Sequence, residues 1–295
     1  MSRSQTVSVV VPAFNAAATI RRALDSALIQ AGCSLDVIVV DDGSTDATPE
    51  LLTEYAGRIR VLRQANAGVA AARNAAIEVA HGDFMAFLDA DDEWLPAKLE
   101  KQLLQFRQGV DIVYCGAFYL TATGVSVKEA PVYLQGDVLP RLMDGNFIPT
   151  SSVVARAECF RRPEVRFPSS LRLGEDYAMW VRLALQHRFA VVREPLVRFQ
   201  VGFHREKYPL LDHERAFDYI ERMLAEHLGP TDPRRSAIRH MRASGCWNTA
   251  VLEAREGRYL ASSRAAFRAL RARPFGFRGI FHYLRHGLFV RPGAR

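Results

Sequence analysis

Residues 37–52 read Val-Ile-Val-Val-Asp-Asp-Gly-Ser-Thr-Asp-Ala-Thr-Pro-Glu-Leu-Leu, and they pass from an apolar run through a polar turn into a helical pattern. The apolar run, residues 37–40, is typical of a strand that is buried on both faces. Pro49 suits the first turn of a helix, where its missing N–H group costs no hydrogen bond. The stretch therefore predicts one strand–turn–helix unit of an α/β fold.

Short β-rich runs and helical patterns alternate in the same way over the first half of the chain, which is typical of βαβ units and a mainly parallel sheet flanked by helices. The predicted strands are residues 7–11, 37–40, 59–62, 84–88 and 112–120, the first four buried on both faces, and the predicted helices are residues 18–30, 49–55, 69–80 and 96–108. Acid-rich segments follow several strands, at the edge where open α/β sheets bind ligands.

The second half of the chain has a different organisation. Residues 121–173 predict loops with a short strand at 151–156, followed by a helix at 175–186 and extended runs at 190–192 and 196–201. Beyond residue 205 the pattern predicts helices at 212–227, 236–255 and 259–272. We therefore expect a domain of residues 1–204 and a helical C-terminal extension of residues 205–295.

The net charge of +7 belongs to the C-terminal extension. Residues 205–295 carry 18 basic and 9 acidic side chains, whereas residues 1–204 carry 21 and 23. Such a block predicts either an anionic partner such as phospholipid or a solvated helix face. No recognisable nucleic-acid module is present, so we exclude a nucleic-acid partner.

The tail also has an apolar stripe that predicts peripheral contact with an anionic membrane, the alternative being a helix docked on the rest of the chain. In this stripe Phe277, Ile280, Phe281, Leu284 and Leu288 fall at helical spacing opposite Arg278, His282 and Arg285. No apolar run approaches the roughly 20 residues of a membrane-spanning helix. The four cysteines are widely spaced, and the N-terminus has no signal pattern. These features predict a cytoplasmic, reduced location, with the inner membrane face as an alternative.

The first acidic cluster is Asp41-Asp42, which comes directly after the predicted strand of residues 37–40. Asp46, a few residues later, is explained as a cap of the following helix. Paired charges beside a buried strand repel each other unless something binds them. Carboxylates at this position can accept hydrogen bonds from a nucleobase or a ribose.

The second cluster is Asp89-Ala90-Asp91-Asp92-Glu93, after the strand of residues 84–88. Mg²⁺ is held by one or two carboxylates together with substrate phosphates, and this cluster suits such an open site. A calcium-binding loop is excluded because Trp94 occupies the position that requires glycine. The remaining alternative is a set of acidic residues that caps the next helix.

Two further motifs have both a structural and a functional interpretation. Small residues between Asn66 and Asn74 let a helix pack closely on a sheet, and Arg73 among them can bind a pyrophosphate. Glu175-Asp176 opens a predicted helix, where acidic residues are favoured electrostatically. An acid at that position can also serve as a general base toward a hydroxyl.

Five motifs in this order closely resemble those of the family 2 glycosyltransferases, over residues 7–204. They are Val-Ser-Val-Val-Val-Pro-Ala-Phe-Asn at residues 7–15, Val-Asp-Asp-Gly-Ser-Thr-Asp at 40–46, Asn-x-Gly-x-x-x-Ala-Arg-Asn at 66–74, Leu-Asp-Ala-Asp-Asp at 88–92, and Glu175-Asp176. The resemblance implies a GT-A fold, a nucleotide-sugar donor that is usually a UDP-sugar, and transfer with inversion.

The resemblance also implies a role for each matching residue. The nucleotide-sugar site comprises Pro12, Ala13, Phe14, Asn15 and Asp42 at the base, Asn66 and Gly68 of the third motif, Arg73 toward the diphosphate, and Asp89 at the ribose. Asp91 is expected to reach a Mn²⁺ or Mg²⁺ ion, with Asp92 as its substitute. His204 is either a late metal ligand or an exposed loop histidine. Asp176 is the expected base.

The chain is thus expected to be a hexosyl- or N-acetylhexosaminyltransferase that acts in cell-surface polysaccharide or glycolipid synthesis. Its expected acceptor is the hydroxyl group of a saccharide or of a lipid-linked acceptor. The Gln-x-x-Arg-Trp motif of processive synthases is missing, so single addition is expected. The alternative is a non-catalytic module of the same fold that only binds nucleotide-sugars. Such a module predicts loss of Asp91 or Asp176, and both are present.

Overall fold

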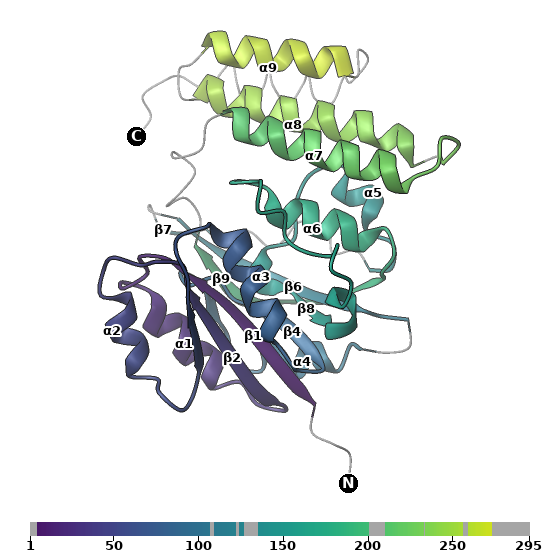
Figure 1. Cartoon of the computed structure of the whole chain (residues 1–295). Helices are drawn as coiled ribbons and strands as arrows, with labels where there is room; N and C mark the ends of the chain where they lie inside the picture. The colour runs from purple at the N-terminus through teal and green to yellow at the C-terminus, as the bar shows by residue number, and fades with distance from the viewer. Residues whose placement is uncertain are drawn as a thin grey trace. The chain divides into compact units, whose positions relative to one another are not determined.

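The computed structural model describes residues 5–106, 109–121, 124–126, 135–200, 210–232, 234–255 and 259–272. They form two compact units (Figure 1). Unit 1 comprises Met1–Val138 and Phe147–Tyr208, and unit 2 comprises Leu139–Asn146 and Pro209–Arg295. The boundary near residue 205 stays a prediction. The apolar stripe that begins at Phe277 lies outside the described residues.

Unit 1 is built on a sheet whose first half is parallel, as Figure 1 shows for β1 and β2. The strand order in this half is β3-β2-β1-β4, with β1 at Thr6–Ala13, β2 at Ser34–Asp41, β3 at Arg60–Arg63 and β4 at Phe84–Phe87. β1 and β2 pair without a register shift from Thr6 opposite Ser34 to Ala13 opposite Asp41. The predicted α/β fold is confirmed.

The second half of the sheet mixes directions. Next to β4 come β8 (Val154–Arg156), β6 (Ile112–Thr121), β9 (Phe189–Gln200) and β5 (Glu93–Trp94), while β7 (Gly124–Ser126) pairs only with β6. β6 runs parallel to β9 and antiparallel to β8, and β8 runs antiparallel to β4. β9 is one strand where two extended runs were predicted. β5 and β7 were not predicted.

Helices cover the sheet with their small and apolar residues. In unit 1 these are α1 (Ile20–Leu28), α2 (Thr48–Thr53), α3 (Val69–Val79), α4 (Lys98–Leu103) and α6 (Glu175–Ala184), with short 3₁₀ turns η1 (Thr150–Ser152) and η2 (Ala157–Phe160). In α1 the buried residues Ile20, Ala23, Leu24 and Ala27 have the spacing of one helix face. α3 packs across β1 and β2 (Figure 1). Each predicted helix of this unit is present but shorter.

One predicted burial pattern is wrong. Residues 59–62 were expected to form a strand buried on both faces, but β3 lies at the edge of the sheet and Arg60, Val61 and Arg63 are exposed. A strand with charged residues at both ends suits an edge position, where charge discourages pairing with another chain.

Unit 2 is helical, as predicted for the C-terminal extension. It contains α5 (Leu139–Leu142), α7 (Leu210–His227), α8 (Arg235–Arg255) and α9 (Tyr259–Ala272). Gly245 lets α8 approach α7 closely, because a Cβ atom at this position would lie 2.1 Å from the Phe217 ring. No helix of the described ranges has both the length and the apolar character needed to cross a bilayer.

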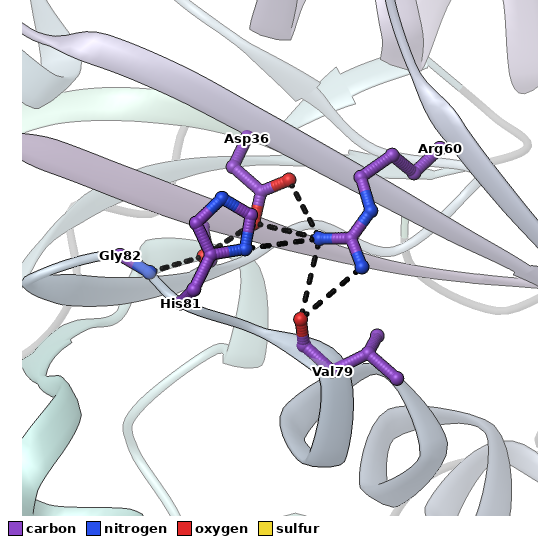
Figure 2. Close-up of polar contacts among 6 residues, drawn as sticks. Asp36, Arg60, Val79, His81 and Gly82 are labelled. Carbon is purple, nitrogen blue, oxygen red and sulfur yellow. Dashed lines mark hydrogen bonds and ion pairs between the residues drawn. The ribbon is translucent and has the colours of Figure 1, made fainter.

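A polar cluster lies near the amino-terminal ends of the parallel strands. Asp36 is buried and accepts hydrogen bonds from Ser8 Oγ at 2.7 Å and from Arg60 Nη1 at 3.0 Å. Figure 2 shows these contacts around Asp36, Arg60, Val79, His81 and Gly82. Arg60 also donates to the carbonyl oxygen of Val79, 3.2 Å away. The cluster ties β1, β2 and β3 together at the end opposite the acidic motifs, so it stabilises the sheet without occupying their edge.

Lys98 is a buried cation in the core of unit 1. Its side chain is inaccessible, Nζ lies 4.1 Å from the centroid of the Trp94 ring, and no described residue offers this nitrogen a hydrogen bond. Burial lowers the pKa of Lys98 from 10.5 to about 8. A charged ammonium group in this place destabilises the folded state, and the contact with Trp94 offsets only part of that cost.

We predict that Lys98→Met raises the free energy of unfolding at neutral pH by about 1 to 3 kcal/mol, since a lowering of this size in pKa corresponds to about 3 kcal/mol at most. Between pH 8 and 10.5 the unfolded chain binds the Lys98 proton more tightly than the folded protein. Wild-type stability should therefore rise with pH across this window, and the variant should lose that rise. Urea unfolding of wild type, Lys98→Met and the half-exposed control Lys101→Met at about pH 7 and about pH 10 tests this. An equal pH dependence in all three proteins contradicts it.

Candidate functional site

The end of β1 supplies the first predicted site residues. Pro12 and Ala13 are the last residues of the strand and are buried, whereas Phe14 is 49% exposed and Asn15 is exposed. Asn15 has a φ of 49°, and its Oδ1 accepts a hydrogen bond from Thr45 N at 2.8 Å. The turn after β1 is therefore fastened to the turn after β2. Phe14 is exposed at this edge, and its place in a base pocket stays a prediction.

Asp41 and Asp42 are both buried, and the protein itself binds their charges. Asp41 Oδ1 accepts from Ser44 N at 2.9 Å, and Arg63 Nε lies 3.3 Å from its other oxygen. Asp42 Oδ1 accepts from Ala67 N at 2.9 Å and from Gln64 Nε2 at 2.7 Å, and its Oδ2 accepts from Gly68 N at 2.8 Å. These contacts account for the paired charges without a ligand. Because a carboxylate oxygen accepts two hydrogen bonds, Oδ2 of Asp42 has capacity for one more.

The segment after β3 reaches the same edge. Asn66 and Gly68 are exposed, and Gly68 has a φ of 91°, a conformation that favours glycine, directly before α3. A Cβ atom on Gly43 would lie 2.9 Å from Asn66 N, so the turn after β2 packs closely on this segment. The first three motifs thus meet at one edge of the sheet.

Arg73 is buried rather than open to the surface. Only 3% of it is exposed, and it forms two ion pairs: Nη2 donates to Asp89 Oδ1 at 2.7 Å, and Nη1 donates to Glu175 Oε1 at 2.8 Å. Its Nε has no hydrogen-bond partner in the described residues. The carboxylates raise the pKa of Arg73 above its usual range despite its burial. Its predicted place toward a diphosphate stays a prediction.

The three aspartates after β4 have different surroundings. Asp89 is partly exposed and pairs with Arg73. Asp92 is buried, accepts a hydrogen bond from the Ser151 hydroxyl and accepts another from Gln200 N at 2.8 Å. Burial raises the pKa of Asp92 well above its usual range, and the two other aspartates act in the same direction. Asp91 is partly buried, and its carbonyl oxygen accepts a hydrogen bond from an arginine on α1.

Glu175 and Asp176 begin α6 after Gly174, whose φ is 78°. Burial raises the pKa of Glu175 to about 7, Asp176 adds to the rise, and Arg73 opposes it. Burial also raises the pKa of Asp176, and Arg73 again opposes the rise. Asp176 Oδ2 lies 3.3 Å from Thr150 Oγ1, and Oδ1 accepts from Tyr177 N at 2.6 Å. The pKa values of both carboxyl groups are thus raised by burial, and the role of Asp176 as the base stays a prediction.

Metal binding by the described residues stays a prediction. They contain no group of three or more His, Cys, Asp or Glu side chains arranged to hold a metal ion, and His204 lies outside them. Mg²⁺ needs only one or two carboxylates beside substrate phosphates. Arg73 occupies one oxygen of Asp89, and Ser151 and Gln200 bind Asp92. The roles of Asp91 and Asp92 as metal ligands therefore stay predictions.

Two residues of η1, Ser151 and Thr150, contact the acidic motifs, and neither was assigned an individual role from the sequence. Ser151 Oγ accepts from Asp89 N at 3.0 Å and donates to Asp92, and its carbonyl oxygen accepts from Trp94 Nε1 at 2.8 Å. Thr150 lies beside Asp176. The only local signal is a polar Thr-Ser-Ser run between apolar residues, which does not show where η1 lies relative to the acidic motifs.

Comparison with known proteins identifies relatives of this chain. A family model described as glycosyl transferase family 2 matches residues 8–135. The succinoglycan biosynthesis protein ExoU of Rhizobium meliloti is 30% identical over 261 residues, which cover 80% of this chain and 74% of that protein. An uncharacterized glycosyltransferase of Rickettsia felis is 30% identical over 201 residues, 66% of this chain and 33% of that protein. The chain therefore spans about a third of the length of some curated relatives that it matches.

Solved structures share the fold. S. aureus TarS 1-349 in complex with UDP-GlcNAc has a TM-score of 0.63 at 19% identity, covering 97% of this chain and 93% of that chain. The mannosyltransferase PcManGT from Pyrobaculum calidifontis, in complex with GDP-Man and Mn²⁺, has a TM-score of 0.58 at 19% identity, covering 96% and 81%. The likeness confirms the GT-A fold that the motifs predicted.

Proposed function

Because this chain belongs to the family 2 glycosyltransferases, we propose that it transfers a hexosyl or N-acetylhexosaminyl group from a nucleotide diphosphate donor to an acceptor hydroxyl, with inversion. The observation that carries the proposal is the joining of two acidic segments by Arg73. Asp89 belongs to the predicted donor side and Glu175-Asp176 to the predicted acceptor side, and both contact the same guanidinium group. The predicted donor side and the predicted acceptor side are thereby joined through one side chain.

In the proposed reaction the acceptor oxygen forms a bond to the anomeric carbon while the bond from that carbon to the diphosphate oxygen breaks. Asp176 takes the hydroxyl proton, which raises the nucleophilicity of the oxygen. The donor lies against Pro12, Ala13, Phe14, Asn15, Asp42, Asn66, Gly68, Arg73 and Asp89. Asp91, with Asp92 and His204 as further ligand candidates, would hold a Mn²⁺ or Mg²⁺ ion, which would supply positive charge to stabilise the departing diphosphate.

The comparisons support a polysaccharide product and a nucleotide-sugar donor, and we propose a UDP-sugar as that donor. One relative is described as a succinoglycan biosynthesis protein, and one structural neighbour binds UDP-GlcNAc while another binds GDP-Man. Because the chain lacks the motif of processive synthases, we propose that it adds a single sugar to a saccharide or lipid-linked acceptor.

A donor screen tests the function. Nucleotide release from UDP-, GDP- and dTDP-sugars is measured with Mn²⁺ or Mg²⁺, with and without mixed saccharide and lipid-linked acceptors. We expect turnover with one nucleotide class, most strongly a UDP-sugar, and loss of turnover in Asp176→Asn. Tight donor binding without any turnover contradicts the proposal and supports the non-catalytic module.

We further propose that the C-terminal extension, residues 205–295, contacts the inner membrane face through α9. Its exposed face holds Leu260 and Phe267, which are 70% and 63% exposed, together with exposed Arg264 and Arg271. These residues share one helix face because their spacings are four, seven and eleven residues. The opposite face, with Ser262 and Ala269, is buried. α9 carries no acidic residue, so its exposed face is complementary to anionic lipid.

The prediction is that the protein sediments with phosphatidylglycerol vesicles at low salt and not with phosphatidylcholine vesicles. High salt should release it, because surface charges are screened. Arg264→Glu combined with Arg271→Glu should weaken sedimentation, whereas Arg222→Glu on α7 should change it little. Sedimentation that does not depend on lipid charge, or none at low salt, contradicts the prediction.

A further inference from the structure

One guanidinium group joins carboxylates that are far apart in the sequence. Arg73 contacts Asp89, 16 residues away, and Glu175, 102 residues away, with donor–acceptor distances of 2.7 and 2.8 Å. Arg73 is on α3, Asp89 follows β4 and Glu175 begins α6. Each carboxylate binds a different nitrogen of the planar guanidinium group. A movement of one carboxylate would therefore change the hydrogen-bond geometry of the other.

Packing fixes the guanidinium in place. Its Cζ atom lies 5.2 Å from the centroid of the Phe167 ring. The backbone of Phe167 is held by Asn74, the next residue on α3, whose Nδ2 donates to Phe167 O at 2.8 Å and whose Oδ1 accepts from Phe167 N at 2.9 Å. An arginine stacked and paired in this way has a single orientation. It can therefore set the positions of both carboxylates.

These contacts give the two acidic residues of α6 different surroundings. Glu175 accepts a charge-assisted hydrogen bond from Arg73, whereas Asp176 is beside the Thr150 hydroxyl. The charges that face Asp176 are Glu175 on its own helix, Arg73 on α3 and Asp89 after β4. Arg73 is the positive one among them. A guanidinium bound to a carboxylate favours its ionised form and makes it a weaker base.

We propose that Arg73 is a positioning residue that fixes Asp89 and Glu175 as bound carboxylates and so reserves Asp176 to take the acceptor proton. The inference rests on the proposed function. It differs from the diphosphate contact that the motif predicts, because Arg73 then acts on the base as well as on the donor side. Loss of Arg73 should affect the protonation of Asp176 and the rate of transfer more than the affinity for the donor.

The test compares Arg73→Gln, Arg73→Lys and Glu175→Gln in nucleotide release from the best donor, measured against pH. In Arg73→Gln we expect kcat to fall by about 10²-fold, the usual effect of a misplaced reacting group, with a smaller change in KM for the donor. The acid limb of the plot of kcat against pH should move up by about one pH unit or more, since the positive charge of Arg73, which opposes protonation of Asp176, is lost. Arg73→Lys keeps a positive charge, so kcat should fall while the limb moves less. Glu175→Gln should move the acid limb to lower pH, because it removes a negative charge beside Asp176.

A double variant separates this role from general support of the fold. In Arg73→Gln/Glu175→Gln the carboxylate that the guanidinium compensated is gone, so the acid limb should return toward its wild-type position. A merely structural role gives additive losses and no such return. Thermal unfolding reports on stability in each variant. Arg21→Gln is the matched control, because it removes an exposed arginine–glutamate pair between α1 and α2.

Two results would overturn this inference and leave the proposed function standing. In the first, the wild type is active and the acid limb does not move in any Arg73 variant. In the second, the Arg73 variants show a higher KM for the donor with unchanged kcat. The second result favours a diphosphate contact. A wild type that turns over no nucleotide-sugar overturns the proposed function, and this inference with it. If Arg73→Gln does not fold, Arg73→Lys and Glu175→Gln decide through opposite effects on the profile.

Discussion

Asp176→Asn should lower sugar transfer by a factor on the order of 10² to 10⁴, the usual contribution of a positioned general base, while donor binding persists. Asparagine keeps the size and shape of the side chain and can still accept a hydrogen bond from Thr150, whose oxygen lies 3.3 Å from Asp176 Oδ2. It cannot take a proton from an acceptor hydroxyl. The substitution therefore removes the chemistry and leaves the binding surface of the donor intact.

Two measurements on the same protein make this prediction specific. Calorimetry of UDP with Mn²⁺ should give nearly the wild-type affinity, and the transfer assay should show the loss. Asp218→Asn is a matched control, because Asp218 is an exposed aspartate on α7 that pairs with an arginine. Near-normal transfer in Asp176→Asn would mean that Asp176 is not the base. Glu175→Gln would then be the next variant to assay for loss of the base.

The pH dependence of wild-type transfer follows from the same group. Burial raises the pKa of Asp176 above its ordinary value of 3.8, and Arg73 opposes this rise. Since the base must be ionised, transfer should increase as pH rises through the folded-state pKa of Asp176. Asp176→Asn should abolish this acid limb in whatever activity remains.

The parallel half of the sheet was predictable because its signals are local. β1 and β2 are apolar runs that each end in a polar turn, and these turns lead into the helices α1 and α2. Burial of β3 was not predictable in the same way. Whether a short strand is central or at the edge depends on its neighbours in the sheet, and no neighbour covers β3 on one side.

The acidic motifs were found from the sequence, but their contacts were not. Asp41 and Asp42 were expected to repel each other without a ligand, yet backbone N–H groups of Ser44, Ala67 and Gly68 bind them. Such partners depend on how two turns meet, which the residues of one turn do not reveal. Arg73 is a similar case, because the partners that bury it lie 16 and 102 residues away.

The segment from residue 121 to 173 was the least predictable part of the fold. β8 has three residues and η1 also has three, too few for a periodic pattern to form. Their places are set by tertiary contacts, such as the hydrogen bonds from Gln102 Nε2 to Val113 O and to Ser152 O, at 3.0 and 2.8 Å. The contacts of Ser151 with Asp92 and of Thr150 with Asp176 depend on this tertiary packing and could not be predicted residue by residue.

Asp91→Ala should weaken donor binding in the presence of Mn²⁺ and lower transfer by about 10²-fold or more, because charge stabilisation by a bound cation is worth several kcal/mol. Chelation with excess EDTA should abolish wild-type turnover, and Mn²⁺ or Mg²⁺ should restore it. Asp92→Asn is the informative comparison. Asp92 is buried with hydrogen bonds to Ser151 and Gln200, so we expect its loss to lower thermal stability more than metal-dependent binding.

Calorimetry of UDP, with and without Mn²⁺, on wild type and both variants decides between these roles. In the wild type Mn²⁺ should strengthen UDP binding, in Asp91→Ala it should have little effect, and in Asp92→Asn most of the effect should remain in the folded fraction. Full turnover in excess EDTA, or an unchanged effect of Mn²⁺ in Asp91→Ala, contradicts the assignment. If Asp92→Asn instead loses the Mn²⁺ effect, Asp92 is the ligand, and its hydrogen bonds to Ser151 and Gln200 must break when the donor binds.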